Sequence, residues 1–143
     1  MTDAQRWYVD SSVLLRAIVD ESRAAKDWLD RASARGDVFV ASRLMEVEVR
    51  RVSMNAGVDQ GLVGQYLDQF VLLTVDDALL AEAIGLGQAL GGADAIHVAS
   101  ALRVGAGAVT MVTHDKQMAD AAAQLGFAVL DPVGDDPGHG PVG

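Results

Sequence analysis

Four acidic residues offer the most distinctive chemistry of this chain. Asp10, Asp94 and Asp115 each lie where an apolar segment meets the expected start of a helix, and Glu48 lies in the apolar stripe of another expected helix. Carboxylates that are far apart in sequence can converge on one hard cation. Mg²⁺ and Mn²⁺ prefer oxygen ligands, so such a site needs neither Cys nor His. The four acids therefore predict a carboxylate metal site.

A cation among these acids would create a hydrolytic centre. A bound metal lowers the pKa of a water molecule so that it can attack a phosphodiester, and it offsets charge on the phosphate and the leaving oxygen. Without a cation the crowded carboxylates repel one another, so divalent metal is expected to stabilise the protein. The residue types thus predict hydrolysis of nucleic acid with Mg²⁺ or Mn²⁺ as cofactor.

Each aspartate also has an ordinary structural explanation. An Asp before a helix commonly accepts hydrogen bonds from the free N–H groups of the first turn, and for any single Asp this is the commoner role. Glu48 favours the metal, because it lies between Leu44 and Val52 at four-residue steps, on the stripe expected to face the core. A lone buried carboxylate is costly. The alternative to a metal is a partly buried salt bridge between Glu48 and Arg51, one turn further along the helix.

The elements that must position these acids alternate between strand-like and helix-like segments. Apolar strands without a polar face, alternating with helices, are typical of a parallel sheet covered on both sides. We therefore expect an α/β fold, a three-layer α/β/α domain with a mostly parallel central sheet. Ligands of such sheets bind beyond the carboxyl ends of the strands, where Asp10 and Asp115 should lie. The expected strands are 7–9, 38–41, 71–75, 109–113 and 127–130, and the expected helices are 11–19, 23–35, 44–56, 94–103 and 116–125, with a weaker helix from Asp59 and another after Asp76.

Length and composition set the domain organisation. The chain has 143 residues, half of them hydrophobic, which suffices for one globular domain with a sizeable core. We expect this domain to span residues 1–131. The segment 132–143 is rich in Pro, Gly and Asp, has little to bury, and is predicted to be a mobile tail.

Composition also limits the chemistry and the partners. The chain has no cysteine, which excludes disulfides, thiolate zinc sites and thiol nucleophiles. No basic N-terminal segment leads into a long apolar run, and no stretch approaches the roughly 20 apolar residues that span a bilayer, so a cytoplasmic protein without a membrane partner is expected. The net charge of −9 argues against a nucleic-acid binder that relies on a broad basic surface.

Four short motifs follow one another in the order and spacing of a known family. They are Tyr8-Val9-Asp10-Ser11-Ser12-Val13-Leu14-Leu15, Ser42 with Glu48 six residues later, Ala93-Asp94-Ala95-Ile96-His97-Val98-Ala99, and Val112-Thr113-His114-Asp115. From Tyr8 to Pro132 the chain resembles PIN-domain ribonucleases, specifically VapC-type toxins of type II toxin–antitoxin pairs. Each motif alone is weakly specific, whereas all four in order form a specific pattern.

The resemblance implies an endoribonuclease that hydrolyses RNA with Mg²⁺ or Mn²⁺, forms a homodimer, and is silenced by a VapB-type antitoxin. Ser12 and Thr113 match hydroxyl positions near the centre and are candidate supporting residues. The metal ligands would be three of the acids, Asp10, Asp94 and Asp115. The implied catalytic residues are the acidic quartet Asp10, Glu48, Asp94 and Asp115.

Several alternatives stay open at this point. Met45-Glu46 within the second motif allows an alignment shifted to Glu46, although Glu46 lies on another helix face with Arg43 and Arg50 nearby. His97 lies one turn after Asp94 and is expected to be a packed helix histidine. The alternative functions are a PIN-type RNA-processing nuclease without an antitoxin and a non-catalytic module whose acidic pocket binds a basic peptide arm.

Overall fold

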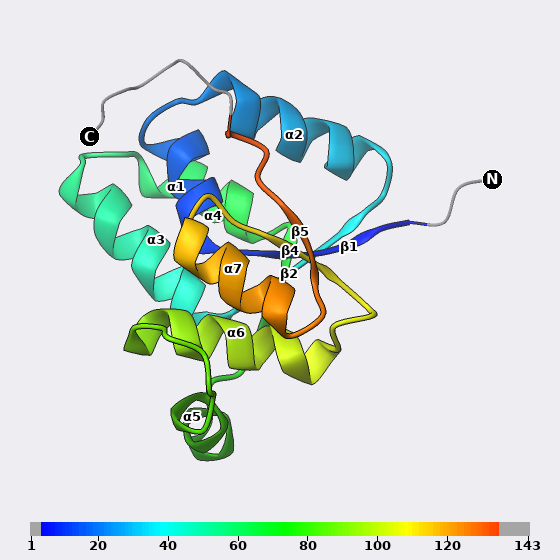
Figure 1. The fold of residues 1–143 in the computed structure, drawn as a ribbon. Coiled ribbons are helices and arrows are strands. Elements are labelled where there is room, and N and C mark those ends of the chain that lie inside the picture. The colour runs from blue at the N-terminus through cyan, green and yellow to red at the C-terminus, as the bar shows by residue number, and fades with distance from the viewer. Residues whose placement is uncertain (1–3, 135–143) are drawn as a thin grey trace.

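A five-stranded sheet forms the centre of the computed structural model, which describes residues 4–134. The strand order is β3-β2-β1-β4-β5, and all neighbouring strands are parallel (Figure 1). The predicted mostly parallel sheet is thus parallel throughout. The strands are β1 Arg6–Val9, β2 Val38–Ser42, β3 Phe70–Leu73, β4 Thr110–Val112 and β5 Ala128–Leu130.

The helices predicted from apolar periodicity are all present. The helix expected after Asp76 ends at Ile84, and the weak one after Asp59 is also formed. Side chains of Ser22, Asp59 and Asp76 accept hydrogen bonds from first-turn N–H groups, which explains why helices begin there. The helices are α1 Ser11–Ile18, α2 Arg23–Ala34, α3 Arg43–Asn55, α4 Gln60–Leu67, α5 Asp77–Ile84, α6 Gly92–Val104 and α7 Lys116–Gln124.

Two hydrophobic clusters cover the two faces of the sheet. Successive strand residues point to opposite faces, so Val9 packs in a cluster with residues of α1 to α4, while Tyr8 packs with residues of α6 and α7. Helix α5 packs on the outside of α6 through Leu79 and Ala83 (Figure 1). This arrangement confirms the three-layer α/β/α prediction.

The sheet topology indicates at which rim of the sheet a ligand is expected to bind. From β1 the chain adds β2 and β3 on one side and β4 and β5 on the other, so the strand order reverses next to β1. Val9 and Val112 are register partners at the carboxyl ends of β1 and β4, and the Asp10 N–H donates to the Val112 carbonyl at 2.9 Å. Open α/β sheets bind ligands at such a switch point. Asp10 and Thr113, the first residues after these two strands, therefore flank the expected crevice.

The C-terminal part of the described chain is packed. Val133 is 1% exposed and belongs to the same cluster as Val9. Residues 135–143 lie outside the described residues, so the prediction of a mobile tail stays a prediction for that segment. Within residues 4–134, no helix is both long and apolar enough to cross a membrane.

The burial of α3 can be tested with two valines on one helix. Val49 is fully buried, so Val49→Ala is expected to lower the free energy of unfolding by about 1–3 kcal/mol through the cavity it leaves. Val47 is 55% exposed, and Val47→Ala should change the free energy of unfolding by less than about 0.5 kcal/mol. Urea unfolding measures both values. Equal losses would contradict the orientation of α3 described here.

Candidate active site

Asp10 is buried at the carboxyl end of β1, with 4% of its surface exposed. It occupies the position before α1, yet its side chain makes no capping hydrogen bond. Instead Oδ2 accepts hydrogen bonds from Ser12 Oγ at 2.7 Å and from Thr113 Oγ1 at 3.0 Å. The capping explanation is therefore wrong for Asp10. Both predicted supporting residues contact this carboxylate.

Ser12 and Thr113 also connect Asp10 to the loop after β4. The Thr113 hydroxyl accepts the Asp115 N–H at 3.0 Å, and the Ser12 hydroxyl accepts the His114 N–H at 3.1 Å. Each hydroxyl thus donates to Asp10 and accepts from the backbone near Asp115. The two hydroxyls fix the loop against the end of β1. The His114 ring itself lies 3.0 Å from an Asp131 oxygen.

Asp115 and Asp94 lie at the starts of two helices but in different roles. Asp115 caps α7, because its Oδ1 accepts the Met118 N–H at 3.1 Å. Asp94 is in the first turn of α6, whose cap position is Gly91. Capping therefore explains Asp115 and neither of the other two aspartates.

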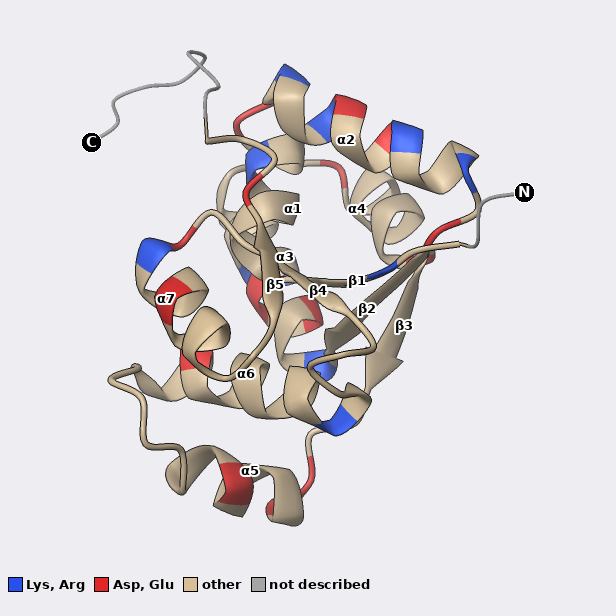
Figure 2. Cartoon of the chain, turned by 45° about the vertical axis from the view of Figure 1, so that its right-hand side comes forward, with Lys and Arg blue, Asp and Glu red and all other residues tan. Residues whose placement is uncertain are grey.

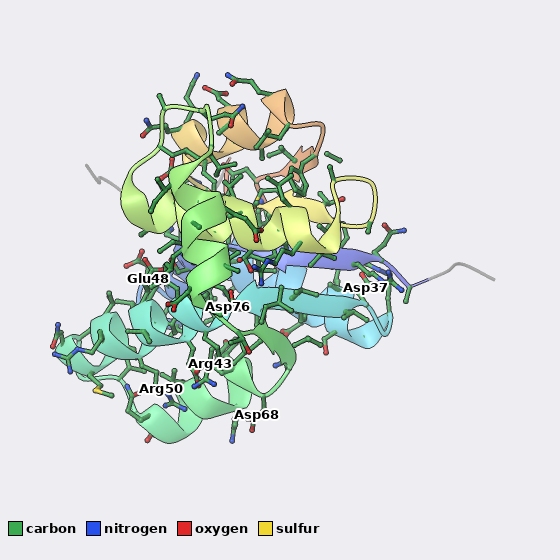
Figure 3. All side chains as sticks on the ribbon, turned by 90° about the horizontal axis from the view of Figure 1, so that it is seen from below. Asp37, Arg43, Glu48, Arg50, Asp68 and Asp76 are labelled. Atoms are coloured by element: carbon green, nitrogen blue, oxygen red, sulfur yellow. The ribbon has the colours of Figure 1, made fainter. Side chains whose placement is uncertain are left out.

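Glu48 lies on α3 at the border between the core and solvent. The buried stripe of α3 consists of Met45, Val49 and Ser53, whereas Val52 is 43% exposed. The expectation that the stripe with Leu44, Glu48 and Val52 faces the core is thus wrong. Each stripe has two apolar residues and one polar residue at four-residue steps, and only tertiary packing decides between them. Figure 3 shows Glu48 on the side of α3 next to α6.

Among the described residues, no arginine of α3 pairs with Glu48. Glu46 pairs with Arg43 at 2.6 Å, as its spacing predicted, and Arg50 donates to Gln60 of α4. Arg51 makes no ion pair with any residue in the described part of the chain, so the proposed Glu48–Arg51 salt bridge is absent there. The structure thus brings Glu48, and not Glu46, to the site.

His97 is the residue of this site that sequence reasoning missed. It is 1% exposed, and its Nε2 lies 2.7 Å from Glu48 Oε1 and 3.9 Å from Asp10 Oδ1. Its Nδ1 lies 3.5 Å from Ser42 Oγ. The one available signal was its spacing from Asp94, because residues three apart share one face of a helix.

The four acids act on one another electrostatically. Burial and then the charges of Asp115 and Asp10 raise the pKa of Asp94 above its usual value, with a smaller contribution from Glu48. Burial alone would raise the pKa of Glu48, but the hydrogen bond and charge of His97 hold it below its usual value. Burial lowers the pKa of His97, and Glu48 and Asp10 outweigh this effect, so the pKa is raised. Figure 2 shows the acidic positions in red on α3, on α6 and before α7.

The donor set fits a partly hydrated hard cation. It consists of carboxylate oxygens and hydroxyls, the ligands that Mg²⁺ and Mn²⁺ prefer. No three His, Asp or Glu side chains within residues 4–134 are already spaced to enclose an ion. Mg²⁺ keeps several waters and commonly uses only one or two carboxylates, so a closed cage is not required.

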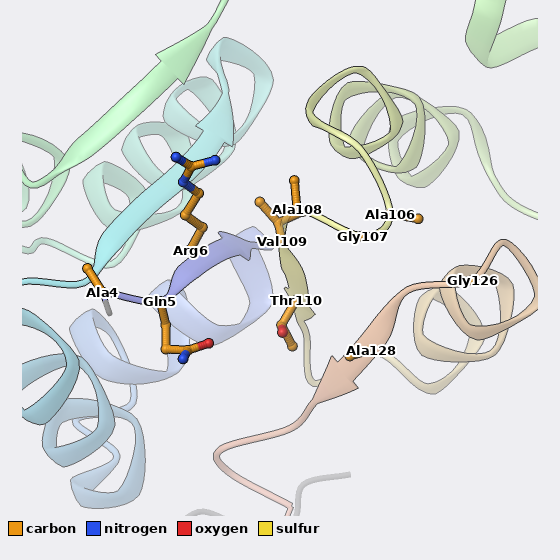
Figure 4. Close-up of a pocket in the computed structure, with 10 residues that line it drawn as sticks. All are labelled: Ala4, Gln5, Arg6, Ala106, Gly107, Ala108, Val109, Thr110, Gly126 and Ala128. Carbon is orange, nitrogen blue, oxygen red and sulfur yellow. The ribbon is translucent and has the colours of Figure 1, made fainter. Parts of the chain in front are cut away.

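The opposite end of the sheet has a pocket of a different kind. It measures about 700 Å³ and lies where β1, β4 and β5 begin (Figure 4). Its lining is mostly backbone and small side chains, with Arg6 as the charged member and none of the acidic residues. This pocket offers no carboxylate chemistry, and the candidate active site is therefore the rim with Asp10.

Known proteins are similar in sequence to this chain over most of its length. The PIN domain family matches residues 7–124. Ribonuclease VapC46 of Mycobacterium tuberculosis is 36% identical over 127 residues, which cover 87% of this chain and 96% of that protein. Ribonuclease VapC35 of the same species is 34% identical over 133 residues, with the same shares of 87% and 96%.

Solved structures share the fold. A toxin–antitoxin complex from Klebsiella pneumoniae contains a chain with a TM-score of 0.66 and 18% identity, covering 88% of this chain and 97% of that one. VapBC2 from Rickettsia felis, bound to a DNA fragment from their promoter, gives a TM-score of 0.66 and 12% identity over 88% of this chain and 98% of the other. At such identities the likeness supports the fold alone. The family match and the sequence relatives together show that this chain belongs to the PIN domain family, among its VapC-type ribonucleases.

Proposed function

We propose that this VapC-type ribonuclease is a metal-dependent endoribonuclease toxin, which hydrolyses RNA phosphodiester bonds with Mg²⁺ or Mn²⁺. The observation that carries the proposal is the gathering of the acids at one rim of the sheet. Thr113 hydrogen-bonds both the Asp10 carboxylate and the Asp115 N–H, and His97 lies beside both Glu48 and Asp10. The pKa of Asp94 agrees with this, because it is raised by burial and then by the charges of Asp115 and Asp10. Carboxylates from β1, α3, α6 and the α7 cap thus share one electric field at the switch point of the sheet. A divalent cation is the ligand that relieves such crowding.

In this proposal Asp10, Asp94 and Asp115 hold the cation. When bound, the cation supplies a water molecule of lowered pKa and offsets charge on the phosphate. Ser12 and Thr113 hold the Asp10 carboxylate in one orientation, because both donate hydrogen bonds to its Oδ2. These contacts leave its Oδ1 on the side nearer to His97.

Glu48 has a separate role in the proposal. Its Oε1 is engaged by His97, and its side chain is 29% exposed. Its lowered pKa keeps it ionised near neutral pH, so Oε2 can accept a proton or a hydrogen bond from a water molecule. We assign Glu48 to orienting water at the scissile phosphate.

Two cations beside the acids support RNA as the substrate. Arg51 is one turn from Glu48, and Lys116 directly follows Asp115; neither forms an ion pair among residues 4–134. Unpaired cations are available for phosphate oxygens, whereas the net charge of −9 gives the protein as a whole no attraction for a polyanion. Contact with RNA is thus concentrated at the site.

We also propose a VapB-type antitoxin partner and a homodimer. The structural neighbours from Klebsiella pneumoniae and Rickettsia felis are toxin–antitoxin complexes. The described surface carries apolar side chains that suit protein contacts: Ile84 is 86% exposed, and Leu80 and Ile84 border a pocket of about 440 Å³ between α5 and α6.

Replacing Asp94 tests the proposed reaction. Asp94→Asn removes a proposed cation ligand and should lower Mn²⁺-dependent cleavage of total RNA at least about 100-fold, since even residues behind metal ligands commonly cost 10–100-fold. The matched control is Asp27→Asn, an exposed aspartate on α2, which should cleave like wild type. Undiminished cleavage by Asp94→Asn, in protein with a normal circular dichroism spectrum, would overturn the proposal.

Metal binding can be followed without any substrate. Mn²⁺ at 100 times its Kd should stabilise the wild type by about 2.7 kcal/mol, since only the folded state gathers the acids. Thermal unfolding with and without EDTA measures this, and Asp10→Asn should lose most of the increase in Tm. A wild-type Tm that does not change when Mn²⁺ is added would instead favour the non-catalytic acidic module.

The raised pKa of Asp94 also predicts a pH dependence for the metal-free protein. The folded state protonates Asp94 at a higher pH than the unfolded chain does, so this stabilising contribution is present at low pH and lost as the pH rises through the folded-state pKa. The Tm of wild type relative to Asp94→Asn should therefore increase as the pH falls from about 7 to about 4. Asp94 is partly exposed, so solvent screening keeps the effect to about 1 kcal/mol or less. A flat or opposite difference in EDTA would contradict the described crowding.

A further inference from the structure

We propose that His97 is a positioning residue of the cleavage reaction, which acts by holding the Glu48 carboxylate in its working place between α3 and α6. This inference rests on the proposed ribonuclease function and concerns one side chain that it leaves unassigned. His97 touches neither substrate nor cation in the proposal. Its effect on the reaction passes through Glu48.

The contact itself is short and specific. His97 Nε2 donates to Glu48 Oε1 at 2.7 Å, the length of a strong hydrogen bond to a carboxylate. The ring is 1% exposed, whereas the Glu48 side chain is 29% exposed. The ring that donates is thus held by the core, whereas the carboxylate that accepts is partly exposed. In this arrangement the buried ring fixes the position of the carboxylate.

Glu48 needs such an anchor because of its place on α3. It lies outside the buried Met45, Val49 and Ser53 stripe, so core packing does not select its rotamer. Ordering a free glutamate side chain costs rotamer entropy. Arg51, the nearest candidate on the same helix, does not pair with it among the described residues. The hydrogen bond from His97, which is stronger than one from Ser11, is therefore the main contact that keeps Glu48 from turning into solvent.

The histidine is in turn fixed by the ends of two other elements. Its Nδ1 lies 3.5 Å from Ser42 Oγ, and Ser42 both ends β2 and caps α3 through the Met45 N–H at 3.4 Å. His97 also lies three residues after Asp94 on α6. One ring thus sets the position of α6, which carries Asp94, relative to α3, which carries Glu48.

These contacts argue against two other roles. Nε2 is engaged by Glu48 and Nδ1 faces the buried Ser42, so neither ring nitrogen is free to bind a cation. A histidine that only fills space would have no need of a carboxylate at 2.7 Å, because an apolar side chain of similar volume packs as well. The geometry points to positioning.

The first test compares two replacements in steady-state cleavage of a short RNA. His97→Leu keeps volume and removes the donor; it should lower kcat about 10–100-fold with little change in KM, the usual effect of losing an orienting partner. His97→Gln can still offer an N–H to Glu48 and should recover most of kcat. Ser100→Ala, buried one turn later on α6, is the packing control and should cleave like wild type.

A double-mutant cycle separates positioning from a general structural role. If His97 acts through Glu48, then His97→Leu should cause no further loss in a Glu48→Ala background. Losses that multiply in the double variant would overturn the inference. So would a kcat of His97→Leu equal to that of wild type.

A crystal structure of His97→Leu keeps the inference testable if Glu48→Ala is too slow to measure. The Glu48 carboxylate should leave its wild-type position or lose its density, while α3 and α6 stay in place. An unchanged Glu48 would overturn the inference. If wild type itself cuts no RNA, the proposed function fails, and the crystal structure still decides whether His97 holds Glu48.

Discussion

The mutual repulsion of four carboxylates at one rim of the sheet is the constraint on which the rest of this site depends. The fold offsets this repulsion to a different degree for each of the four acids. Oxygens of three acids receive hydrogen bonds from neighbouring groups: Ser12 and Thr113 donate to Asp10, the Met118 N–H to Asp115, and His97 to Glu48. Asp94 accepts no hydrogen bond from another described residue through its side chain, and its pKa is raised, first by burial and then by the charges of Asp115 and Asp10. The uncompensated charge is concentrated at Asp94.

The parallel sheet makes this arrangement possible because it brings the ends of elements together. Asp10 follows β1, Thr113 follows β4 and Ser42 ends β2, and these strands are neighbours in the sheet. Each of the three polar groups serves two elements at once. Thr113, for example, joins the end of β1 to the start of α7 by donating to Asp10 and accepting from Asp115. The backbone and the acids are therefore positioned by the same hydrogen bonds.

The sequence predicts the elements well, because periodicity and helix caps are local signals, whereas the catalytic role of the acidic quartet stays a prediction. Prediction from sequence fails where tertiary packing chooses between equal local options. The Leu44 stripe and the Met45 stripe of α3 each have two apolar residues and one polar residue, and the Met45 stripe is the one buried against the core. The sequence offered Arg51, on the same helix, as the partner of Glu48. In the structure the partner is His97, which is 49 residues away in the sequence. A hydrogen bond from a buried ring is stronger than an ion pair in water, and no local rule identifies such a partner.

The lack of a ready-made enclosure for an ion has a mechanistic meaning within the proposed function. Mg²⁺ demands octahedral oxygen coordination and is commonly held by one or two carboxylates together with substrate phosphates. A rim with Asp94 uncompensated and the other acids already hydrogen-bonded leaves part of the coordination shell to water and phosphate. In the proposed function, RNA would supply both the reacting bond and further ligands of the cation. Metal and substrate would each strengthen the binding of the other, since linkage makes such coupling reciprocal. A protein with a charge of −9 can thus bind a polyanion at one place without a broad basic surface.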